Sequence, residues 1–580
     1  MSIKQVLSNP VIGDKVFGFL HLKDLKSAAL VCRDFKTFLD CRKFWRQAEI
    51  RIRQDVLSSD RIQNIGNFVV DRKTGVEALL VLLRFLLDKS EDCVLEHIRF
   101  VFTNLSPLTI PTLASAVCTV REVSFKTSVL STSQVQEVMT SVSLSPRLVV
   151  RKLNMCGQDM SEVSADTIAT AVCRLEDVNL RSCDLTPMQL NLLFRTISQG
   201  HKIRIRRLDL MFNDLSEVDP CVLASSLRRL ESVAIDDNEI TTEQIKAFFK
   251  GLVRSSDIGG CSSFNLKKLD IRNYDLSGLT PDIIGAALVK LEEVTISHTH
   301  LTPHHLAAVF QTITTSPIVR LVRLDCSNND VSSVPGDLLT DAVLRLETVN
   351  LSHTRLNQAQ LLTLCKRVAD NPGSMRTLKL GHTPDLVLIT PHILAGAVCR
   401  LEEMSLSAWD TTELTVEQLD YLCTAITECS SLRLRSLELS YQDLSDITPD
   451  TLALAVCCLE DVDLYDTKLT TRQLDTLFNV ILDCKDLKLR RLDLAKNDLG
   501  GVEHGKLGDA LCRVVDVDLE YTEITSDSIR SLARVITEQS VQLRYLNLRD
   551  NEDSDNVTQD ILDSIIMRLA RFEYECDLHD

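Results

Sequence analysis

The stretch Leu208-Asp209-Leu210-Met211-Phe212-Asn213-Asp214-Leu215 decides the fold, because its pattern of apolar residues and asparagine recurs along the chain. A second phrase, Ala171-Val172-Cys173-Arg174-Leu175-Glu176-Asp177-Val178-Asn179-Leu180, alternates with it. The two phrases usually end 25 and then 30 residues apart, and successive copies of the second phrase are 55, 55, 61, 55, 55, 58, 55 and 55 residues apart. A fixed period of this kind is the sequence signature of stacked repeats. The spacing predicts nine double repeats, or about eighteen single ones.

Each repeat is predicted to form a strand, a turn and a helix. After the strand, a threonine followed by proline recurs, which is typical of a helix N-cap and first turn. Apolar residues then follow at helical spacing. The slot of Asn213 is predicted to turn inward and bond the turning backbone. The threonine–proline signals are Thr186-Pro187, Thr280-Pro281, Thr302-Pro303, Thr390-Pro391 and Thr448-Pro449, and the slot of Asn213 also holds Asn238, Asn329, Asn497, Asn551, Cys183, Thr299, Thr354, Thr467 and Thr522.

On these motifs, residues 95–580 resemble leucine-rich repeats of the ribonuclease-inhibitor type, which also alternate two repeat classes. The resemblance implies an α/β fold, a leucine-rich-repeat horseshoe. This is a right-handed α/β solenoid with a parallel concave sheet, helices on the convex side and a protein-binding concave face. The resemblance does not imply that ribonuclease is the partner.

Composition excludes several classes of function. The net charge of −17 argues against nucleic acid and against anionic membrane surfaces as partners, since both need clustered Lys and Arg. No run of 18 apolar residues is present, so no membrane-spanning helix is predicted. The start, residues 1–10, lacks the apolar core of a signal peptide.

The nineteen cysteines are predicted to be free thiols. Five occupy one slot of different repeats, which other repeats fill with Val289 or Leu344, so this slot is a small buried apolar position. Neighbouring copies lie two strands apart, about 10 Å, which exceeds the roughly 7 Å that a disulfide allows. Free thiols indicate an intracellular chain, cytoplasmic or nuclear. The five are Cys118, Cys173, Cys399, Cys457 and Cys512.

One strand position alternates in charge from repeat to repeat. Because adjacent parallel strands are about 5 Å apart, opposite charges there are predicted to form a ladder of cross-strand ion pairs that fixes strand order. The basic members are Lys152, Arg207, Lys268, Arg323 and Arg491, and the acidic members are Glu122, Asp177, Glu293, Glu403, Asp461 and Asp516.

The next outward strand position forms an acidic stripe opposed mainly by Lys379. This stripe is either a solvated face or a surface that steers a basic partner. Aromatic residues, only 5% of the chain, gather after the later strands, where they either pack on neighbouring turns or anchor a partner. The stripe comprises Asp209, Asp270, Asp325, Glu438, Asp463, Asp493 and Asp518, and the predicted substrate-binding residues are Trp409, Glu438, Tyr441, Asp463, Tyr465, Asp493, Asp518 and Tyr521.

No catalytic constellation is present in the sequence, and neither a phosphate-binding loop nor a nucleophile elbow occurs. We therefore expect no enzyme activity of its own and no cofactor. A histidine cluster, His298, His300, His304 and His305, is a weak metal candidate. His353 and His382 recur at the slot of His298, which favours an ordinary turn position, so no metal is expected.

Residues 1–50 lack the repeat and are predicted to form three short helices, followed by a helical linker and cap over 51–94. The run from Phe17 to Leu25, then Leu30 to Phe35, resembles an F-box. The opening Ser8-Asn9-Pro10-Val11 departs from the family's Leu-Pro-x-Glu, and a plain helical cap is the alternative. Matching residues are Leu20, Asp24, Leu25, Val31, Cys32, Arg33, Phe35 and Trp45, and the resemblance implies adaptor contacts at Pro10, Ile12, Val16, Phe17, Leu20, Leu25, Val31 and Trp45.

Together, the two resemblances imply the substrate-recognition subunit of a cullin-RING ubiquitin ligase. The F-box would dock on a Skp-type adaptor carried by a cullin scaffold, and the repeats would hold a basic substrate protein. The rival reading is a leucine-rich-repeat scaffold or inhibitor with no connection to a ligase.

Overall fold

The chain divides into two compact units, unit 1 (Met1–Leu279) and unit 2 (Thr280–Asp580). Every predicted adaptor contact falls within residues 1–48, which lie outside the described residues. The computed structural model describes residues 49–51, 67–70, 97–100, 105, 110–126, 128–235, 238–254, 265–408, 413–538, 541–551, 557–558, 561–562, 565, 569 and 571–573.

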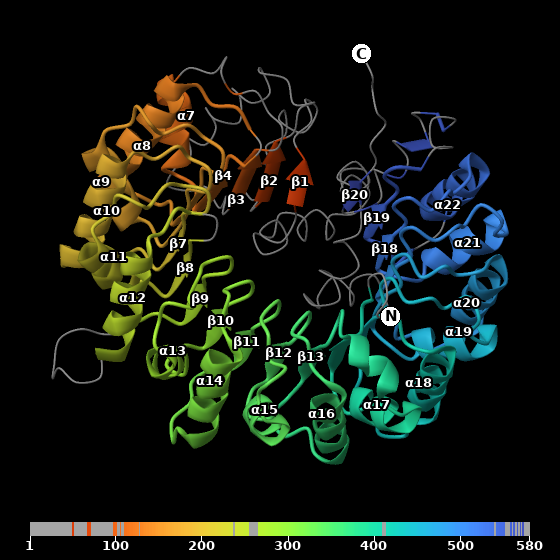
Figure 1. The fold of residues 1–580 in the computed structure, drawn as a ribbon. Helices are drawn as coiled ribbons and strands as arrows, with labels where there is room; N and C mark the ends of the chain where they lie inside the picture. The colour runs from red at the N-terminus through yellow and green to blue at the C-terminus, as the bar shows by residue number, and fades with distance from the viewer. Residues whose placement is uncertain are drawn as a thin grey trace, which may run out of the picture. The chain divides into compact units, whose positions relative to one another are not determined.

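Unit 1 contains a sheet of parallel strands with helices packed on one side (Figure 1). Consecutive strands in the sequence are neighbours in the sheet. Its strands are β1 (Glu49–Arg51), β2 (Asn67–Val70), β3 (His97–Phe100), β4 (Glu122–Ser124), β5 (Lys152–Asn154), β6 (Asp177–Asn179), β7 (Arg207–Asp209), β8 (Ser232–Ala234) and β9 (Lys268–Asp270). Its helices are α7 (Ile110–Val117), α8 (Thr132–Leu144), α9 (Ala165–Arg174), α10 (Pro187–Gln199), α11 (Pro220–Leu227) and α12 (Thr242–Arg254).

Unit 2 repeats the same arrangement, again with parallel pairing of consecutive strands. Its strands are β10 (Glu293–Thr295), β11 (Arg323–Asp325), β12 (Thr348–Asn350), β13 (Thr377–Lys379), β14 (Glu403–Ser405), β15 (Ser436–Glu438), β16 (Asp461–Asp463), β17 (Arg491–Asp493), β18 (Asp516–Asp518), β19 (Tyr545–Asn547) and β20 (Arg571–Glu573). Its helices are α13 (Pro281–Leu288), α14 (Pro303–Thr315), α15 (Gly336–Val343), α16 (Gln358–Asp370), the 3₁₀ helix η2 (Pro384–Leu388), α17 (Pro391–Val398), α18 (Val416–Glu428), α19 (Pro449–Cys457), α20 (Thr471–Asp483), α21 (His504–Leu511) and α22 (Ser526–Glu538).

The parallel sheet starts earlier than the sequence pattern indicates. Strands β1 and β2 lie at residues 49–51 and 67–70, in or beside the range predicted as helical linker and cap, and β2 pairs with β3. Phe68, Val69 and Val70 are aromatic and β-branched residues that favour an extended strand. The boundary predicted at residue 95 therefore does not mark the start of the sheet.

Alternating helix lengths explain the alternating repeat lengths. Helices α8, α10, α12, α14, α16, α18, α20 and α22 each have 13 residues, whereas most helices between them have 8. The difference of five residues equals the difference between the 30-residue and 25-residue steps. The five predicted threonine N-caps are all confirmed, although only Thr186 accepts a side-chain capping bond.

Polar side chains inside each turn keep the buried backbone satisfied. Asn497 donates to the carbonyls of Leu464 and Leu494 at 2.7 and 3.1 Å and accepts from the amide of Leu469 at 3.0 Å. This confirms the predicted inward role of that slot. In the repeat after β9 the slot holds Tyr274, whose hydroxyl bonds the backbone of Ile235 and Asn238.

Arginines of the second phrase cap the preceding long helix, a role that the sequence pattern did not indicate. Arg229 donates to the carbonyls of Ile197, Ser198 and Gly200 at 2.8, 2.8 and 2.7 Å. These carbonyls end α10, where backbone acceptors lack helical partners and a positive charge is stabilising. Arg174, Arg345 and Arg513 bond the ends of α8, α14 and α20 in the same way.

Candidate protein-binding face

The predicted charge ladder is present in part on the sheet face of both units, but Glu403 lies between Thr377 and Ser436 and has no basic neighbour at this position. Consecutive strands pair in register at the alternating position, so opposite charges lie side by side. Each exposed pair contributes at most about 1 kcal/mol, so the ladder mainly favours one strand order. The observed pairs are Lys152–Glu122 at 2.8 Å, Arg207–Asp177 at 2.8 Å, Arg323–Glu293, and Arg491–Asp461 at 4.0 Å.

A second ladder lies one residue before the first, and the sequence reading missed it. Its signal was already visible in the two phrases, because the residue before the strand is Glu in many copies of the second phrase and Arg in many copies of the first. Where both positions are paired, the two ladders offset each other's charges at the start of the strands. The pairs are Arg151–Glu176 at 3.0 Å, Arg206–Glu231 at 3.3 Å, Arg376–Glu402 at 3.8 Å and Arg435–Glu460 at 3.9 Å.

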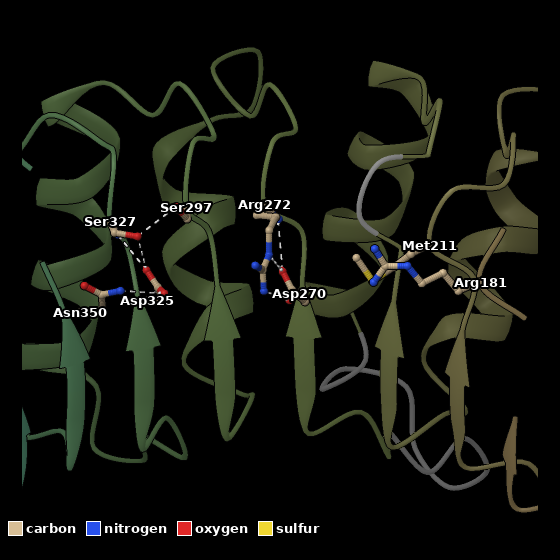
Figure 2. Close-up of polar contacts among 8 residues, drawn as sticks. All are labelled: Arg181, Met211, Asp270, Arg272, Ser297, Asp325, Ser327 and Asn350. Carbon is tan, nitrogen blue, oxygen red and sulfur yellow. Dashed lines mark hydrogen bonds and ion pairs between the residues drawn. The ribbon is translucent and has the colours of Figure 1, made fainter. Parts of the chain in front are cut away.

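The acidic stripe occupies the last residue of the strands, and its two members in unit 1 have different kinds of partner. Asp209 accepts a hydrogen bond from Asn179 at 2.8 Å. Asp270 forms an ion pair with Arg272 at 2.5 Å, which Figure 2 shows at the end of β9. Of these two aspartates, only Asp270 has its charge offset by an ion pair, whereas Asp209 has a neutral donor, like the carboxylates of unit 2 described below.

The first carboxylate of the stripe in unit 2 is also engaged by neutral donors. Asp325 accepts hydrogen bonds from Ser327 at 2.6 Å and from Asn350 at 2.9 Å (Figure 2). The hydroxyl oxygens of Ser327 and Ser297 lie 2.9 Å apart, within hydrogen-bond distance. This network orients the Asp325 carboxylate without neutralising its charge.

Four carboxylates of unit 2 lie in register on consecutive strands. Glu438, Asp463, Asp493 and Asp518 end β15, β16, β17 and β18, and the strand pairing places each beside the next. Adjacent strands are about 4.8 Å apart, so the four form a continuous negative row. We call this row the acidic column. The hydrogen bonds of Asp463 and Asp518 come from Ser440 at 2.9 Å, Asn547 at 2.9 Å and backbone amides, all of them neutral groups.

Within the acidic column, the charged form of Asp493 is disfavoured by its surroundings. Burial, together with the carboxylates of Asp463 and Asp518 on either side, raises the pKa of Asp493 to about 7. A backbone bond from Ala495 at 3.0 Å and the charge of Arg491 only partly oppose this. A positive charge placed over Asp493 would therefore relieve repulsion within the column.

Two of the predicted aromatic anchors lie together at the edge of the acidic column, in the turns that follow β15 and β16. The rings of Tyr441 and Tyr465 meet edge to face with centroids 5.1 Å apart, and the amide of Tyr465 donates to Asp463 at 2.9 Å. Lys496, which the sequence reading overlooked, holds its ammonium 5.1 Å from the centre of the Tyr465 ring. Hydrogen bonding with Tyr465 raises the pKa of Lys496, so this cation stays charged.

Of the other predicted aromatic site residues, only Tyr521 lies within the described part of the chain. Tyr521 lies in the turn after β18 with 51% of its surface exposed, two strands beyond Tyr465. Trp409 lies outside the described residues, as do all the predicted adaptor contacts. The structure therefore brings Tyr441 and Tyr465 to the acidic column and leaves Tyr521 as a separate exposed ring.

The histidine cluster contains an ordinary helix cap. His305 is buried at the start of α14, and its ring nitrogen Nδ1 lies 2.6 Å from the hydroxyl of Thr302. His298 and His300 occupy turn positions with positive φ. Within the described residues, no group of three or more His, Cys, Asp or Glu is arranged to hold a metal ion.

The cysteine slot is buried, as its composition predicts. Cys118, Cys173, Cys399, Cys457 and Cys512 are all buried, and burial raises their thiol pKa values to about 11 or 12. All described cysteines are free thiols. In the described part of the chain, no helix is long and apolar enough to cross a membrane.

Known proteins of the same architecture match the chain. Its sequence is 23% identical over 437 residues to ribonuclease inhibitor of Mus musculus, covering 66% of this chain and 92% of the relative. The parallel strands, the alternating helices and this sequence match together assign the fold. The chain has the leucine-rich-repeat fold. No family model matches the chain.

Solved leucine-rich-repeat structures resemble the chain only loosely. The leucine-rich-repeat-containing protein LegL7 from Legionella pneumophila is 16% identical, covers 52% of this chain and 98% of its own, and has a TM-score of 0.37. The structure of the TLR13–ssRNA13 complex is 12% identical, covers 83% of this chain and 68% of its own, and has a TM-score of 0.33. The sheet of a leucine-rich-repeat solenoid is an extended surface suited to binding a protein.

Proposed function

We propose that this leucine-rich-repeat protein binds a basic partner protein on the sheet face of unit 2. The observation that carries the proposal is the acidic column, four in-register carboxylates none of which forms an ion pair with a described residue. Tyr441 and Tyr465 at its edge supply rigid aromatic surface, which is the commonest kind of interface anchor. The column would set the rate of encounter and the aromatic pair would set the lifetime of the complex.

We further propose that the bound protein is a ubiquitylation substrate. The support is the F-box resemblance of residues 1–50, with Leu20, Val31 and Trp45 among the matching positions. In this role the chain is a non-catalytic, intracellular subunit that joins a Skp-type adaptor and a cullin scaffold to its substrate. The rival role, a leucine-rich-repeat scaffold or inhibitor, rests on the departure at Pro10 and needs the same sheet face but no adaptor.

Adaptor binding separates the two roles. Leu20→Asp combined with Val31→Asp places charges in an apolar interface, so adaptor and cullin should no longer co-purify from cells. Asp463→Lys with Asp493→Lys serves as the matched control, because it should lose the substrate and keep the adaptor. If adaptor is absent from the wild-type preparation, or equal in both, the ligase role is wrong and the scaffold role remains.

A further inference from the structure

The acidic column ends abruptly at β14. Going back along the sheet from Glu438, the last strand residues are Ser405, Lys379 and Asn350 on β14, β13 and β12. Carboxylates return only at Asp325 on β11. Lys379 thus stands in a gap of three strands between Asp325 and the acidic column.

Lys379 differs from the ladder cations on the same sheet face. Lys152, Arg207 and Arg323 each pair with a carboxylate on the neighbouring strand. Lys379 is exposed, and no described residue forms an ion pair with it. The nearby carboxylate of Glu403, at the start of β14, accepts a hydrogen bond from Thr377 at 3.0 Å.

The surroundings of Lys379 are polar and largely uncharged. Gly381 follows it at the strand end, and a Cβ there would collide with the hydroxyl of Ser407. The rings of His353 and His382 stack with centroids 3.9 Å apart in the next turns. Burial lowers the pKa of His353, and His382 and His298 lower it further, which keeps His353 neutral at pH 7. On the neighbouring strands, Asn350 and Ser405 pair in register with Lys379, and both are uncharged.

A uniformly basic segment lying on the acidic column would meet repulsion at Lys379 if it continued past β15. We propose that the partner's docking segment is bipolar, with basic side chains over the acidic column and an Asp or Glu side chain on Lys379. This inference rests on the proposed function and adds the order of basic and acidic side chains along the partner's docking segment. Like-charge repulsion at one end and attraction at the other would fix the register in which the partner lies.

Strand spacing sets the separation of the two charges. Lys379 and Glu438 are two strands apart, roughly 10 Å, which about three residues of extended chain span. The column itself extends over three further strand spacings, about 14 Å. A run of lysines that begins three positions after an acidic residue includes lysines on the same face of the extended chain, because side chains alternate between the two faces.

The test uses two fluorescent peptides, acetyl-Glu-Ser-Ser-Lys-Lys-Lys-Lys-amide and the same peptide with Gln in place of Glu. Because the whole chain is acidic, general electrostatics predicts that the Gln peptide, with its higher net charge, binds more tightly. The bipolar arrangement predicts that wild type binds the Glu peptide about two- to fivefold more tightly at low salt, the range of an exposed pair. In Lys379→Gln the preference should reverse.

The control is Lys366→Gln, which removes an exposed lysine from α16, on the helical side of the sheet, and should keep the wild-type preference. Equal thermal unfolding of both variants would show that neither is misfolded. If wild type and Lys379→Gln both prefer the Gln peptide, the bipolar inference is overturned while the proposed function stands. If neither peptide binds wild type, the proposed function is overturned with it.

Discussion

At the scale of single residues, Tyr441 and Tyr465 are the anchors on which partner affinity should depend. Their rings contact each other at 5.1 Å beside Asp463. Truncating both to alanine should weaken partner binding by about 2 kcal/mol or more, the usual scale of a hot spot. Calorimetric titration with the captured partner measures this, and Tyr421→Ala, a tyrosine exposed on α18, is the matched control.

Asp493 should make stability depend on pH. Its folded pKa of about 7 lies above the usual value near 3.9, so the folded state binds more protons than the unfolded state between these values. Stability therefore falls as pH rises from about 4 to 7. At pH 8, Asp493→Asn should have a larger free energy of unfolding than wild type, by up to about 4 kcal/mol, and it should match wild type near pH 4.

The control for that measurement is Asp446→Asn, an exposed aspartate in the turn before α19, which should leave the pH profile unchanged. Parallel pH profiles for wild type and Asp493→Asn would show that Asp493 ionises like an ordinary surface aspartate.

At the scale of elements, the arginine of the second phrase should stabilise the long helix before it. Arg513 donates to the carbonyls of Leu482 and Cys484 at 2.6 and 2.5 Å, at the end of α20. Arg513→Ala removes charge-assisted bonds from otherwise unpaired carbonyls and should cost about 2 kcal/mol of unfolding free energy. Urea denaturation measures this cost, and Arg472→Ala, exposed in the first turn of α20, should change little.

Elements were largely predictable from sequence, because the repeat imposes one local solution many times. The strand positions, the threonine N-caps and the slot of Asn213 all followed from spacing. The start of the sheet at β1 did not, since residues 49–70 carry neither phrase. The capping role of Arg229 also escaped, because its partners lie about 30 residues earlier and only the fold brings them together.

The candidate site was predictable only in part. The position of the acidic residues on one column could be predicted from strand register alone, whereas the partners of each carboxylate could not. Asp209 and Asp493 have the same slot in the repeat, yet Asn179 bonds one and two carboxylates flank the other. Lys496 was overlooked because a turn lysine has no periodic signal, although its position over Tyr465 helps define the aromatic edge.

At the scale of the whole molecule, the net charge of −17 attracts any basic protein, so specific binding must be separated from general attraction. General attraction depends on the net charge of the protein, whereas binding at the proposed site depends on which carboxylates are replaced by lysine. Two double reversals that change the net charge equally, one in each unit, distinguish these contributions.

The most direct test is the association rate of the captured partner with such variants at two salt concentrations. Asp463→Lys with Asp493→Lys should slow association about tenfold or more at low salt, with the effect shrinking as salt rises, whereas Asp209→Lys with Asp270→Lys should have a much smaller effect. If instead the unit 1 reversals abolish binding and the unit 2 reversals leave it unchanged, the binding face lies on unit 1 and the central claim is wrong.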